Sequence, residues 1–306
     1  MKKDFLAVAD FSPDELKEIL DLAINLKREY FEKGNKPIFK GKVLGMIFNK
    51  PSLRTRISFD MAMRHLGGDA LFISPAEIGL GQRESIADVA RVLSGYVQGI
   101  MARVFAHSHL IDLAKWASVP VINGLSDYNH PCQAMADILT IYEKFGKLKD
   151  LKVTFIGDGN NVAVSLLHTC AKLGLDFSIA SPENYGVEES AWKMAEEFAA
   201  KSGSKLSKFS DPNLAVKDVD VIYTDTWTSM GQEEETEKRL KIFPPYQVNA
   251  ALVDLASTDA IVMHCLPAHR GQEITDEVAD GPHSMLFPQA HNRLHAQKAI
   301  LVKLLV

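Results

Sequence analysis

The sequence predicts an α/β protein of two domains, each a parallel sheet flanked by helices, with a C-terminal helix packing back on the first domain. Three observations predict this class. Apolar runs of strand length alternate with segments of helical period through most of the chain, the pattern of parallel strands joined by helical crossovers. The 306 residues exceed one ordinary domain. A last amphipathic segment follows Pro288.

The first domain is expected to span residues 1–147. Four apolar runs have strand length, and a helical period follows each of them: residues 43–48, 70–74, 99–105 and 119–123. Residues 131–145 then repeat apolar side chains at helical spacing and end at Gly146, which is a usual helix stop. The domain boundary is therefore expected near residue 147.

The second domain is expected to span residues 148–288. Its strand-length runs are residues 151–156, 177–180, 219–224 and 261–264. Residues 289–306 form the C-terminal helix, whose apolar side chains are Leu294, Ala299, Ile300 and Leu301. We expect a second parallel sheet and one helix returning to the first domain.

Composition and charge exclude several classes of protein. The formal net charge is -5 and the pI about 6.1, and no basic domain or stripe suits nucleic acid. The acidic run at residues 233–235 is interpreted as a solvated helix start. No apolar run reaches signal-peptide or membrane-spanning form. A cytoplasmic protein without a membrane or nucleic-acid partner is expected.

The cysteines predict neither a disulfide framework nor a metal site. Their number is odd and their spacing is not that of a zinc site: Cys132, Cys170 and Cys265. Cys265 follows His264 at a strand end, and a buried inert thiol is the default expectation there. Neighbouring strand residues point to opposite faces, which argues against a metal shared by this pair. A Cys–His nucleophile is a weakly supported alternative.

Residues 52–56, Ser-Leu-Arg-Thr-Arg, stand between a strand and a helix. Free backbone N–H groups and the helix dipole favour an anion at a helix N-terminus. Ser52 and Thr55 add hydroxyl donors, and Arg56 can fork onto two phosphate oxygens. The motif predicts a site for phosphate or a phosphate ester. The alternative is a simple N-cap at Ser52 beside surface arginines.

Two further polar positions follow other strands of the first domain. Arg103 interrupts an apolar strand, and His130 directly precedes Pro131 at the first position of a helix. The carboxyl ends of parallel strands face the same way, so Ser52, Arg103 and His130 can converge on one crevice. Burial of Arg103 with a partner and no function is the alternative. An anionic ligand accounts for the charge better.

The second domain offers an amide and a carboxylate at strand ends. A glycine turn at residues 157–159 precedes a helix, but the dinucleotide fingerprint fails because Val162 occupies the third glycine position. Asn160 and Asn161 have amides that suit a carboxylate, although asparagine is also common in plain turns. Asp225 ends a later strand and suits an ammonium group. These residues predict a pocket for a zwitterionic amine.

The chain resembles the ornithine carbamoyltransferase family from about Phe5 to Leu305. Residues 52–56, Arg103 and His-Pro-Cys-Gln at 130–133 resemble the carbamoyl phosphate site that aspartate and ornithine carbamoyltransferases share. The ornithine branch is indicated by Gly-Asp-Gly-Asn-Asn at 157–161, Asp225, Ser-Met-Gly at 229–231 and His-Cys-Leu-Pro at 264–267.

The resemblance implies transfer of the carbamoyl group of carbamoyl phosphate to the δ-amine of L-ornithine, giving citrulline and phosphate without cofactor or metal. The catalytic residues would be Arg103, His130 and Cys265. The implied carbamoyl phosphate site comprises Ser52, Leu53, Arg54, Thr55, Arg56, Arg103, His130, Pro131, Cys132, Gln133, Cys265, Leu266 and Arg293. The implied ornithine site comprises Asn161, Asp225, Ser229 and Met230.

One loop departs from the family pattern. Many relatives carry a glutamine five residues before the glutamate of a loop that reaches a neighbouring subunit, and this chain has Gly79 there, with Glu84 as the glutamate. Gln82 is the expected substitute. The resemblance also implies a homotrimer with active sites near subunit interfaces.

Four alternatives to the main prediction stay open. The acceptor can be another amine, such as putrescine or an acylated ornithine. The reaction can serve arginine degradation rather than arginine biosynthesis. A dinucleotide-dependent oxidoreductase and a paralogue without activity are the other two.

Overall fold

The computed structural model describes residues 2–81, 83–229 and 231–306. The chain forms two compact units, the first comprising Met1–Leu139 with His291–Val306 and the second Thr140–Ala290. Both points of division fall inside helices, α6 (Pro131–Phe145) and α13 (Leu286–Leu305). The first division lies eight residues before the expected boundary at 147, and the second lies two residues after the expected boundary at 288.

The first unit contains a parallel sheet with the strand order β2-β1-β3-β4. Its strands are β1 (Val43–Phe48), β2 (Asp69–Ile73), β3 (Gly99–Arg103) and β4 (Val121–Leu125). All four predicted strands are present, with ends shifted by at most two residues, which is the usual uncertainty for element ends. The other elements are η1 (Val8–Asp10), α1 (Pro13–Lys33), α2 (Leu53–His65), α3 (Pro75–Ile78), α4 (Ile86–Ser94), α5 (His107–Trp116), α6 and α13.

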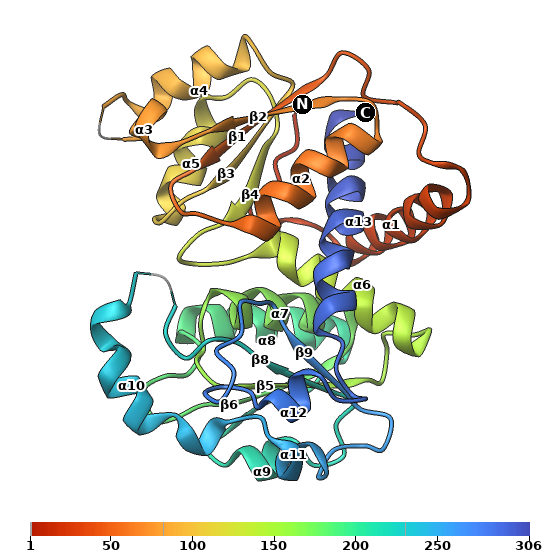
Figure 1. Ribbon diagram of the computed structural model, residues 1–306, viewed down its shortest axis with the longest axis vertical. Helices are drawn as coiled ribbons and strands as arrows, with labels where there is room; N and C mark the ends of the chain where they lie inside the picture. The colour runs from red at the N-terminus through yellow and green to blue at the C-terminus, as the bar shows by residue number, and fades with distance from the viewer. Residues whose placement is uncertain (1, 82, 230) are drawn as a thin grey trace. The chain divides into compact units, whose positions relative to one another are not determined.

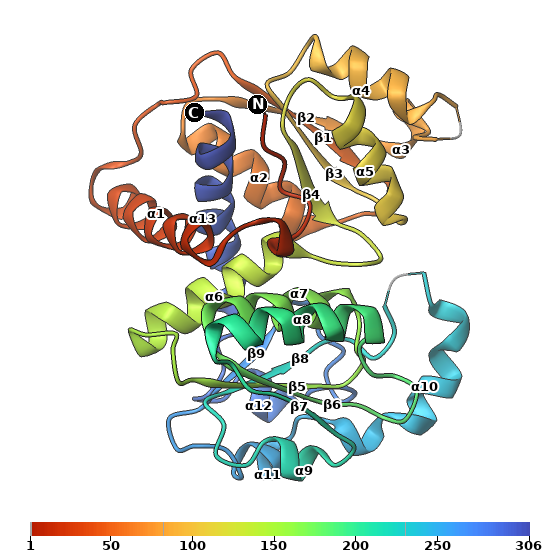
Figure 2. The same cartoon turned by 180° about the vertical axis from the view of Figure 1, so that it is seen from behind.

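Helices cover both faces of this sheet. Helices α4 and α5 pack Val89, Leu110 and Leu113 against strand residues such as Ile47 and Ile100. On the other side α1 and α13 lie next to one another (Figures 1 and 2), and two hydrogen bonds connect α13 to α1 and to the segment that follows α1. Lys27 Nζ donates to Asn292 Oδ1 at 2.8 Å and Lys298 Nζ donates to Asn35 Oδ1 at 2.5 Å. The end of α13 therefore packs on the first unit, as predicted.

The second unit contains a parallel sheet with the strand order β7-β6-β5-β8-β9. Its strands are β5 (Lys152–Ile156), β6 (Asp176–Ala180), β7 (Leu206–Phe209), β8 (Val221–Thr224) and β9 (Ile261–His264). Four were predicted. The fifth, β7, is a short edge strand without a buried residue, so it lacks the apolar run that marks a central strand.

Helices also cover both faces of the second sheet. Figure 2 shows α7 (Asn161–Leu173) and α8 (Glu189–Ser202) on one face, with α9 (Pro212–Ala215) and α11 (Ala250–Val253) on the other. The second layer, completed by α12 (Asp276–Ala279), packs Val216, Leu252 and Val278 on strand residues such as Ile222 and Val262.

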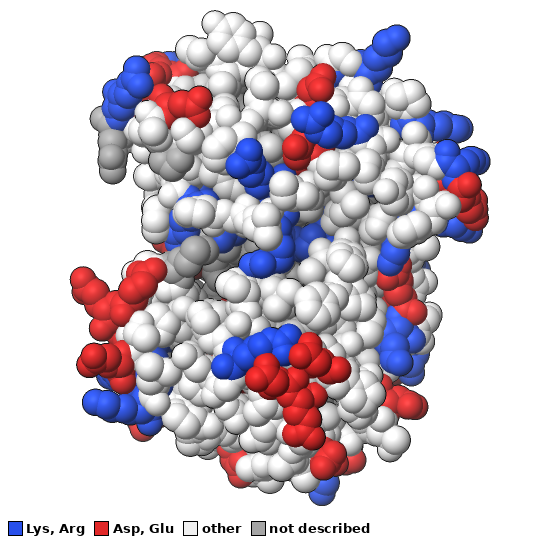
Figure 3. Space-filling model, viewed as in Figure 1, with Lys and Arg blue, Asp and Glu red and all other residues white. Residues whose placement is uncertain are grey.

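The acidic run at residues 233–235 forms a short 3-10 helix, η2 (Glu233–Glu235), that leads into α10 (Thr236–Ile242) and then η3 (Pro244–Tyr246). All three glutamates are exposed, and red side chains gather over this segment in Figure 3. The interpretation as a solvated helix start is confirmed.

Across the described residues, the search for a helix long and apolar enough to span a bilayer finds none.

Strand order places one switch point in each sheet. In the first sheet the chain runs outward from β1 to β2 and then returns to the other side with β3. In the second sheet the same reversal lies between β5 and β8. Ligands of open parallel sheets bind at the carboxyl ends of the strands that flank such a point.

Candidate functional site

The residues before α2 lie at the switch point of the first sheet. Phe48 at the end of β1 pairs in register with Arg103 at the end of β3. Ser52 is the N-cap of α2, and its Oγ accepts a hydrogen bond from the Thr55 N–H at 3.3 Å. The helix N-terminus and Arg103 therefore share one edge of the sheet. Sequence reasoning predicted this convergence from strand polarity.

Arg293 of α13 links this edge to α6. Its guanidinium donates to Gln133 Oε1 at 2.7 Å through Nη1 and to Thr55 Oγ1 at 3.1 Å through Nη2. Gln133 Nε2 in turn donates to Asp137 Oδ1 at 2.8 Å. These four side chains are buried. Side chains of three helices thus form one polar cluster. We call this cluster, together with Ser52, Arg54, Arg103 and His130, the anion half-site.

Buried positive charge dominates the anion half-site. His130 is 4% exposed. Burial, helped by the positive charges of Arg293, Arg103 and Arg54, holds the pKa of the His130 imidazole well below its ordinary value. The ring is therefore neutral at physiological pH and can donate a hydrogen bond. Three guanidinium groups beside a neutral imidazole suit an anionic ligand.

Arg56 lies apart from this cluster. It is exposed, and its guanidinium carbon sits 4.2 Å over the ring of Phe72, which packs on Phe48 at 5.3 Å between ring centroids. Leu53 is also exposed. Of the two arginines in the motif, Arg54 is the one whose charge acts on His130.

Pro131, Cys132 and Lys50 also stand near this edge of the sheet. Pro131 begins α6. Cys132 is buried, its Sγ donates to Asn123 O at 3.3 Å, and burial raises the pKa of its thiol to about 12. That group is a packed thiol and no nucleophile. Lys50 was not among the predicted site residues. It is 7% exposed with its Nζ 4.1 Å over the Phe105 ring, and its position two residues after β1 was the available signal.

The turn after β5 lies beside the end of β8 in the second unit. Asn160 caps α7, its Oδ1 accepting from the Val162 and Ala163 N–H groups at 3.0 and 3.1 Å. The Asn160 Nδ2 donates to Asp225 Oδ2 at 2.8 Å and lies 3.5 Å from Ser229 Oγ. Asn161 is the first residue of α7 and is half-buried. At the switch point the amide of Asn160 therefore contacts the predicted carboxylate, and Asn161 directly follows it in the chain.

Asp225 also contacts the thiol of Cys265. The Cys265 Sγ donates to Asp225 Oδ1 at 3.0 Å, and the same oxygen accepts from the Thr226 N–H at 2.8 Å. Cys265 is half-buried, so the expectation that this thiol is buried is wrong. We call Asn160, Asn161, Asp225, Ser229, Cys265 and Leu266 the amide–carboxylate half-site. Met230 lies outside the described residues.

A buried ion pair supports this half-site and was not predicted. Arg239 donates to Asp158 Oδ2 at 3.0 Å and to the Trp227 carbonyl at 2.7 Å. Burial raises the pKa of the Asp158 carboxyl to about 6, against the opposing effect of Arg239. The pair ties the glycine turn to the segment after Asp225. Its members are far apart in the sequence, so no local pattern marked it.

The expected divergence of His264 and Cys265 is wrong. Ligand atoms of Asp225, His264 and Cys265 lie within 4.8 Å of one another, because β9 ends at His264 and Leu266 takes a positive φ of 58°. Both ring nitrogens of His264 nevertheless have hydrogen-bond partners, the Leu266 N–H at 2.8 Å and Glu273 Oε1 at 3.0 Å. The His264 imidazole would have to lose one of these two hydrogen bonds to ligate a metal ion.

The loop that departs from the family pattern is described only in part. Gln82 lies outside the described residues. Gly79 has φ 48°, and a Cβ built there would stand 2.8 Å from Arg83 Cβ. A side chain at position 79 would therefore be strained in this backbone.

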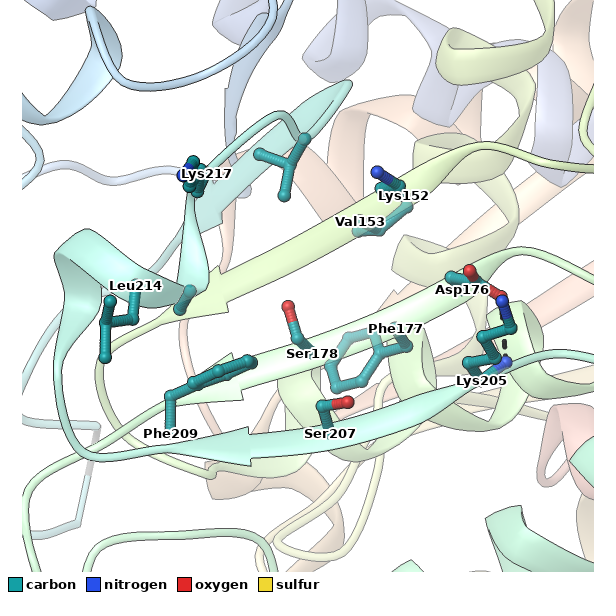
Figure 4. Close-up of a pocket in the computed structure, with 12 residues that line it drawn as sticks. Lys152, Val153, Asp176, Phe177, Ser178, Lys205, Ser207, Phe209, Leu214 and Lys217 are labelled. Carbon is teal, nitrogen blue, oxygen red and sulfur yellow. Dashed lines mark hydrogen bonds between the residues drawn. The ribbon is translucent and has the colours of Figure 1, made fainter.

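A cavity of about 200 Å³ in the second unit lies away from every predicted site residue. Figure 4 shows it over strands β5, β6 and β7, with Ser178, Ser207 and Phe209 among its lining side chains. Lys152, Lys205 and Lys217 stand at its rim and are exposed. Because these lysines are solvated and Ser178 already bonds Thr154 at 2.6 Å, the cavity has no polar group that requires a ligand.

The two half-sites define a two-unit α/β protein with an anion site on one parallel sheet and a carboxylate–amide site on the other. A family model described as the carbamoyl-P binding domain of aspartate/ornithine carbamoyltransferase matches residues 3–143. Its Asp/Orn binding domain counterpart matches residues 149–304. The chain belongs to the aspartate/ornithine carbamoyltransferase family.

Individual relatives are similar over nearly their whole length. An ornithine carbamoyltransferase of Pyrococcus abyssi is 55% identical, covering 99% of this chain and 96% of that protein. The corresponding Bacillus subtilis protein is 54% identical, covering 99% and 94%. The solved structure of ornithine carbamoyltransferase from Pyrococcus furiosus has a TM-score of 0.97 at 53% identity, covering 99% of this chain and 97% of that one.

Proposed function

We propose that this protein transfers the carbamoyl group of carbamoyl phosphate to the δ-amine of L-ornithine, forming L-citrulline and phosphate. The observation that carries the proposal is the buried neutral His130 among Arg54, Arg103 and Arg293 at the N-terminus of α2. Such a cluster suits a phosphorylated donor with a carbonyl group. The names of the relatives, all ornithine carbamoyltransferases, support the same reaction.

The first unit is proposed to bind the donor. Backbone N–H groups of α2, with the side chains of Ser52, Arg54 and Thr55, would hold the phosphate. Arg56 would join them only after leaving its stacked position on Phe72. Gln133 and Arg293 would bind the carbamoyl end and fix Thr55.

The second unit is proposed to bind ornithine. Asp225 would pair with the α-ammonium, while Asn161, Ser229 and Met230 would hold the α-carboxylate and the backbone of the substrate. Putrescine lacks the α-carboxylate, and an acylated ornithine lacks the charged amine that Asp225 requires. The buried carboxylate of Asp225 therefore favours the free amino acid as acceptor.

The proposed mechanism is direct attack of the neutral δ-amine on the carbonyl carbon of the donor. An alkyl amine has a pKa of about 10.4 in water, so a dry pocket must favour its deprotonated form. Arg103, neutral His130 and the Thr55 hydroxyl would stabilise the negative oxygen of the tetrahedral intermediate. Loss of one such donor costs about 10²–10³ in rate.

Orientation of the two substrates is proposed to supply most of the remaining catalysis. Holding both reactants in attack geometry contributes about 7–11 kcal/mol, so the mechanism uses no covalent nucleophile. Cys265 and Leu266 would contact the reacting groups. The proposed donor residues belong to the first unit and the proposed acceptor residues to the second, so the reaction would need both units.

We also propose a cytoplasmic homotrimer with a role in arginine biosynthesis. One relative, from Pyrococcus furiosus, is named an anabolic ornithine carbamoyltransferase at 54% identity. Self-association is supported by apolar side chains exposed near the edge strand β2 and the start of α2: Leu53, Ile57, Leu71 and Phe72. The proposed domains are residues 1–147 for the donor and 148–288 for ornithine, with residues 289–306 returning to the first.

A citrulline-formation assay tests the proposed function. Purified protein is given carbamoyl phosphate with ornithine, putrescine or N-acetylornithine, and the ureido product is measured. We expect product with ornithine alone. In parallel, carbamoyl phosphate should raise the melting temperature and NAD should not. Product with another amine, or stabilisation by NAD, would contradict the proposal.

A further inference from the structure

A buried carboxylate outside the predicted site contacts His264, the residue directly before Cys265. Glu273 and His264 are both 0% exposed, and His264 Nε2 lies 3.0 Å from Glu273 Oε1. A carboxylate oxygen accepts hydrogen bonds, so Nε2 carries the proton of the imidazole. On the other side of the ring, His264 Nδ1 lies 2.8 Å from the Leu266 nitrogen. A backbone N–H only donates, so Nδ1 must be the unprotonated acceptor.

This tautomer holds a strained turn. Leu266 has φ 58°, in the left-handed region that is unfavourable for a residue with a side chain. The hydrogen bond from its N–H to the imidazole compensates for that strain. The residue before it is Cys265, whose Sγ contacts Asp225. The ring therefore fixes the backbone between two residues of the amide–carboxylate half-site.

Glu273 is itself fixed from several directions. Its Oε1 also accepts from the His269 N–H at 2.6 Å, and its own carbonyl accepts from the Val248 N–H at 2.8 Å. Its Oε2 is buried and has no hydrogen-bond partner among the described residues. One oxygen of the carboxylate thus holds both the imidazole and the loop that follows it. A buried carboxylate kept in this way orients its histidine, as outer-shell carboxylates do for metal-ligating histidines.

We propose that Glu273 is a positioning residue: it fixes the Nε2–H tautomer of His264, which holds the Leu266 amide and so places Cys265 and Leu266 for the reaction. This inference rests on the proposed function for its kinetic consequence. Without Glu273 the proton can move to Nδ1, where it would face the Leu266 N–H, donor against donor at 2.8 Å. The turn would then lose its support and move away from Asp225.

Two substitutions separate positioning from charge. Glu273→Gln keeps a carbonyl oxygen where Oε1 accepts both hydrogen bonds, and places the amide NH₂ where Oε2 accepts no hydrogen bond and lies 3.8 Å from His269 Nδ1. Glu273→Ala removes the acceptor. We expect Glu273→Gln to retain near wild-type kcat and KM, and Glu273→Ala to lose about 10- to 100-fold in kcat/KM for ornithine. The KM for carbamoyl phosphate should change much less.

Two readouts do not depend on turnover. Nitrogen-15 NMR of His264, assigned by comparison with His264→Asn, should show a single Nε2–H tautomer in wild type and Glu273→Gln and a mixture in Glu273→Ala. Iodoacetamide should alkylate Cys265 faster in Glu273→Ala, because the thiol leaves its carboxylate partner. Cys132 and Cys170 are buried, and Cys265→Ser gives the background rate.

The outcomes separate the two proposals. If wild type forms no citrulline, the proposed function fails, and the tautomer and alkylation data still decide the role of Glu273. An unchanged tautomer with unchanged alkylation in Glu273→Ala overturns the positioning role. If Glu273→Gln lowers kcat/KM for ornithine as much as Glu273→Ala does, the positioning role is also overturned, because the charge of the carboxylate would then be the property that matters. If Glu273→Ala does not fold, Glu273→Asp replaces it, because a carboxylate one methylene shorter cannot keep both contacts.

Discussion

Replacing Arg239 by methionine should unfold the second unit more readily, because the substitution leaves a buried carboxylate without its cation. Arg239 is 4% exposed and Asp158 7% exposed, with 3.0 Å between their charged atoms. Removing one partner of a buried pair costs about 3–5 kcal/mol. Loss of the hydrogen bond to the Trp227 carbonyl leaves that acceptor unsatisfied and adds about 1–3 kcal/mol.

The pH dependence of the loss follows from Asp158. Its pKa is about 6 in the folded protein against 3.8 for the ordinary group. The folded state therefore binds the proton more tightly, and this group lowers stability as pH rises from about 4 to about 6. The cost above pH 6 is about 3 kcal/mol at 1.36 kcal/mol per pKa unit. Without Arg239 the folded pKa rises further, so the variant should lose more stability at pH 8 than at pH 5.

Thermal and urea unfolding at pH 5 and pH 8 measure this effect. Arg270→Met is the matched control in the same unit, because Arg270 pairs with Asp276 and Asp280 at the surface and exposed pairs contribute little. Asp158→Asn in the Arg239→Met background should restore part of the stability at pH 8. Equal losses for Arg239→Met and Arg270→Met, with no difference between the two pH values, would refute the reasoning.

Three further predictions concern the half-sites and one buried lysine. Arg56→Ala should weaken carbamoyl phosphate binding, whereas Asp225→Ala should raise the KM for ornithine and leave donor affinity nearly intact; equal effects on both substrates in steady-state kinetics would contradict this division. Arg293→Lys should weaken donor binding about tenfold or more in calorimetry, because an ammonium cannot bridge Gln133 and Thr55 as the guanidinium does, and unchanged affinity would show that the bridge is dispensable. Burial lowers the pKa of Lys298 to about 8 from 10.5, so the folded state disfavours the charged amine and this group adds stability as pH increases from about 8 to 10.5. The melting temperature of Lys298→Met relative to wild type should therefore be higher at pH 7 than at pH 10. A difference in melting temperature that does not change with pH would refute the pKa shift.

Local sequence patterns predicted most of the fold for a physical reason. Central parallel strands are buried on both faces and read as short apolar runs, so β1, β5 and the other central strands could be located from the sequence. The edge strand β7 could not, because its residues Leu-Ser-Lys-Phe form no apolar run. Strand polarity also placed Ser52, Arg103 and Asp225 at the carboxyl edges of their sheets. Those positions follow from chain direction alone.

Contacts between distant residues were decided only by the tertiary structure. Arg54 rather than Arg56 acts on His130 because helix geometry turns Arg56 onto Phe72. His264 and Cys265 approach one another because β9 stops at His264, which ends the alternation of side chains. Residues such as Asp158 with Arg239, and His264 with Glu273, meet through packing between separate elements. The sequence by itself determined which residue types stand at the strand ends; side-chain direction and long-range packing, which no local period encodes, decided which of them touch.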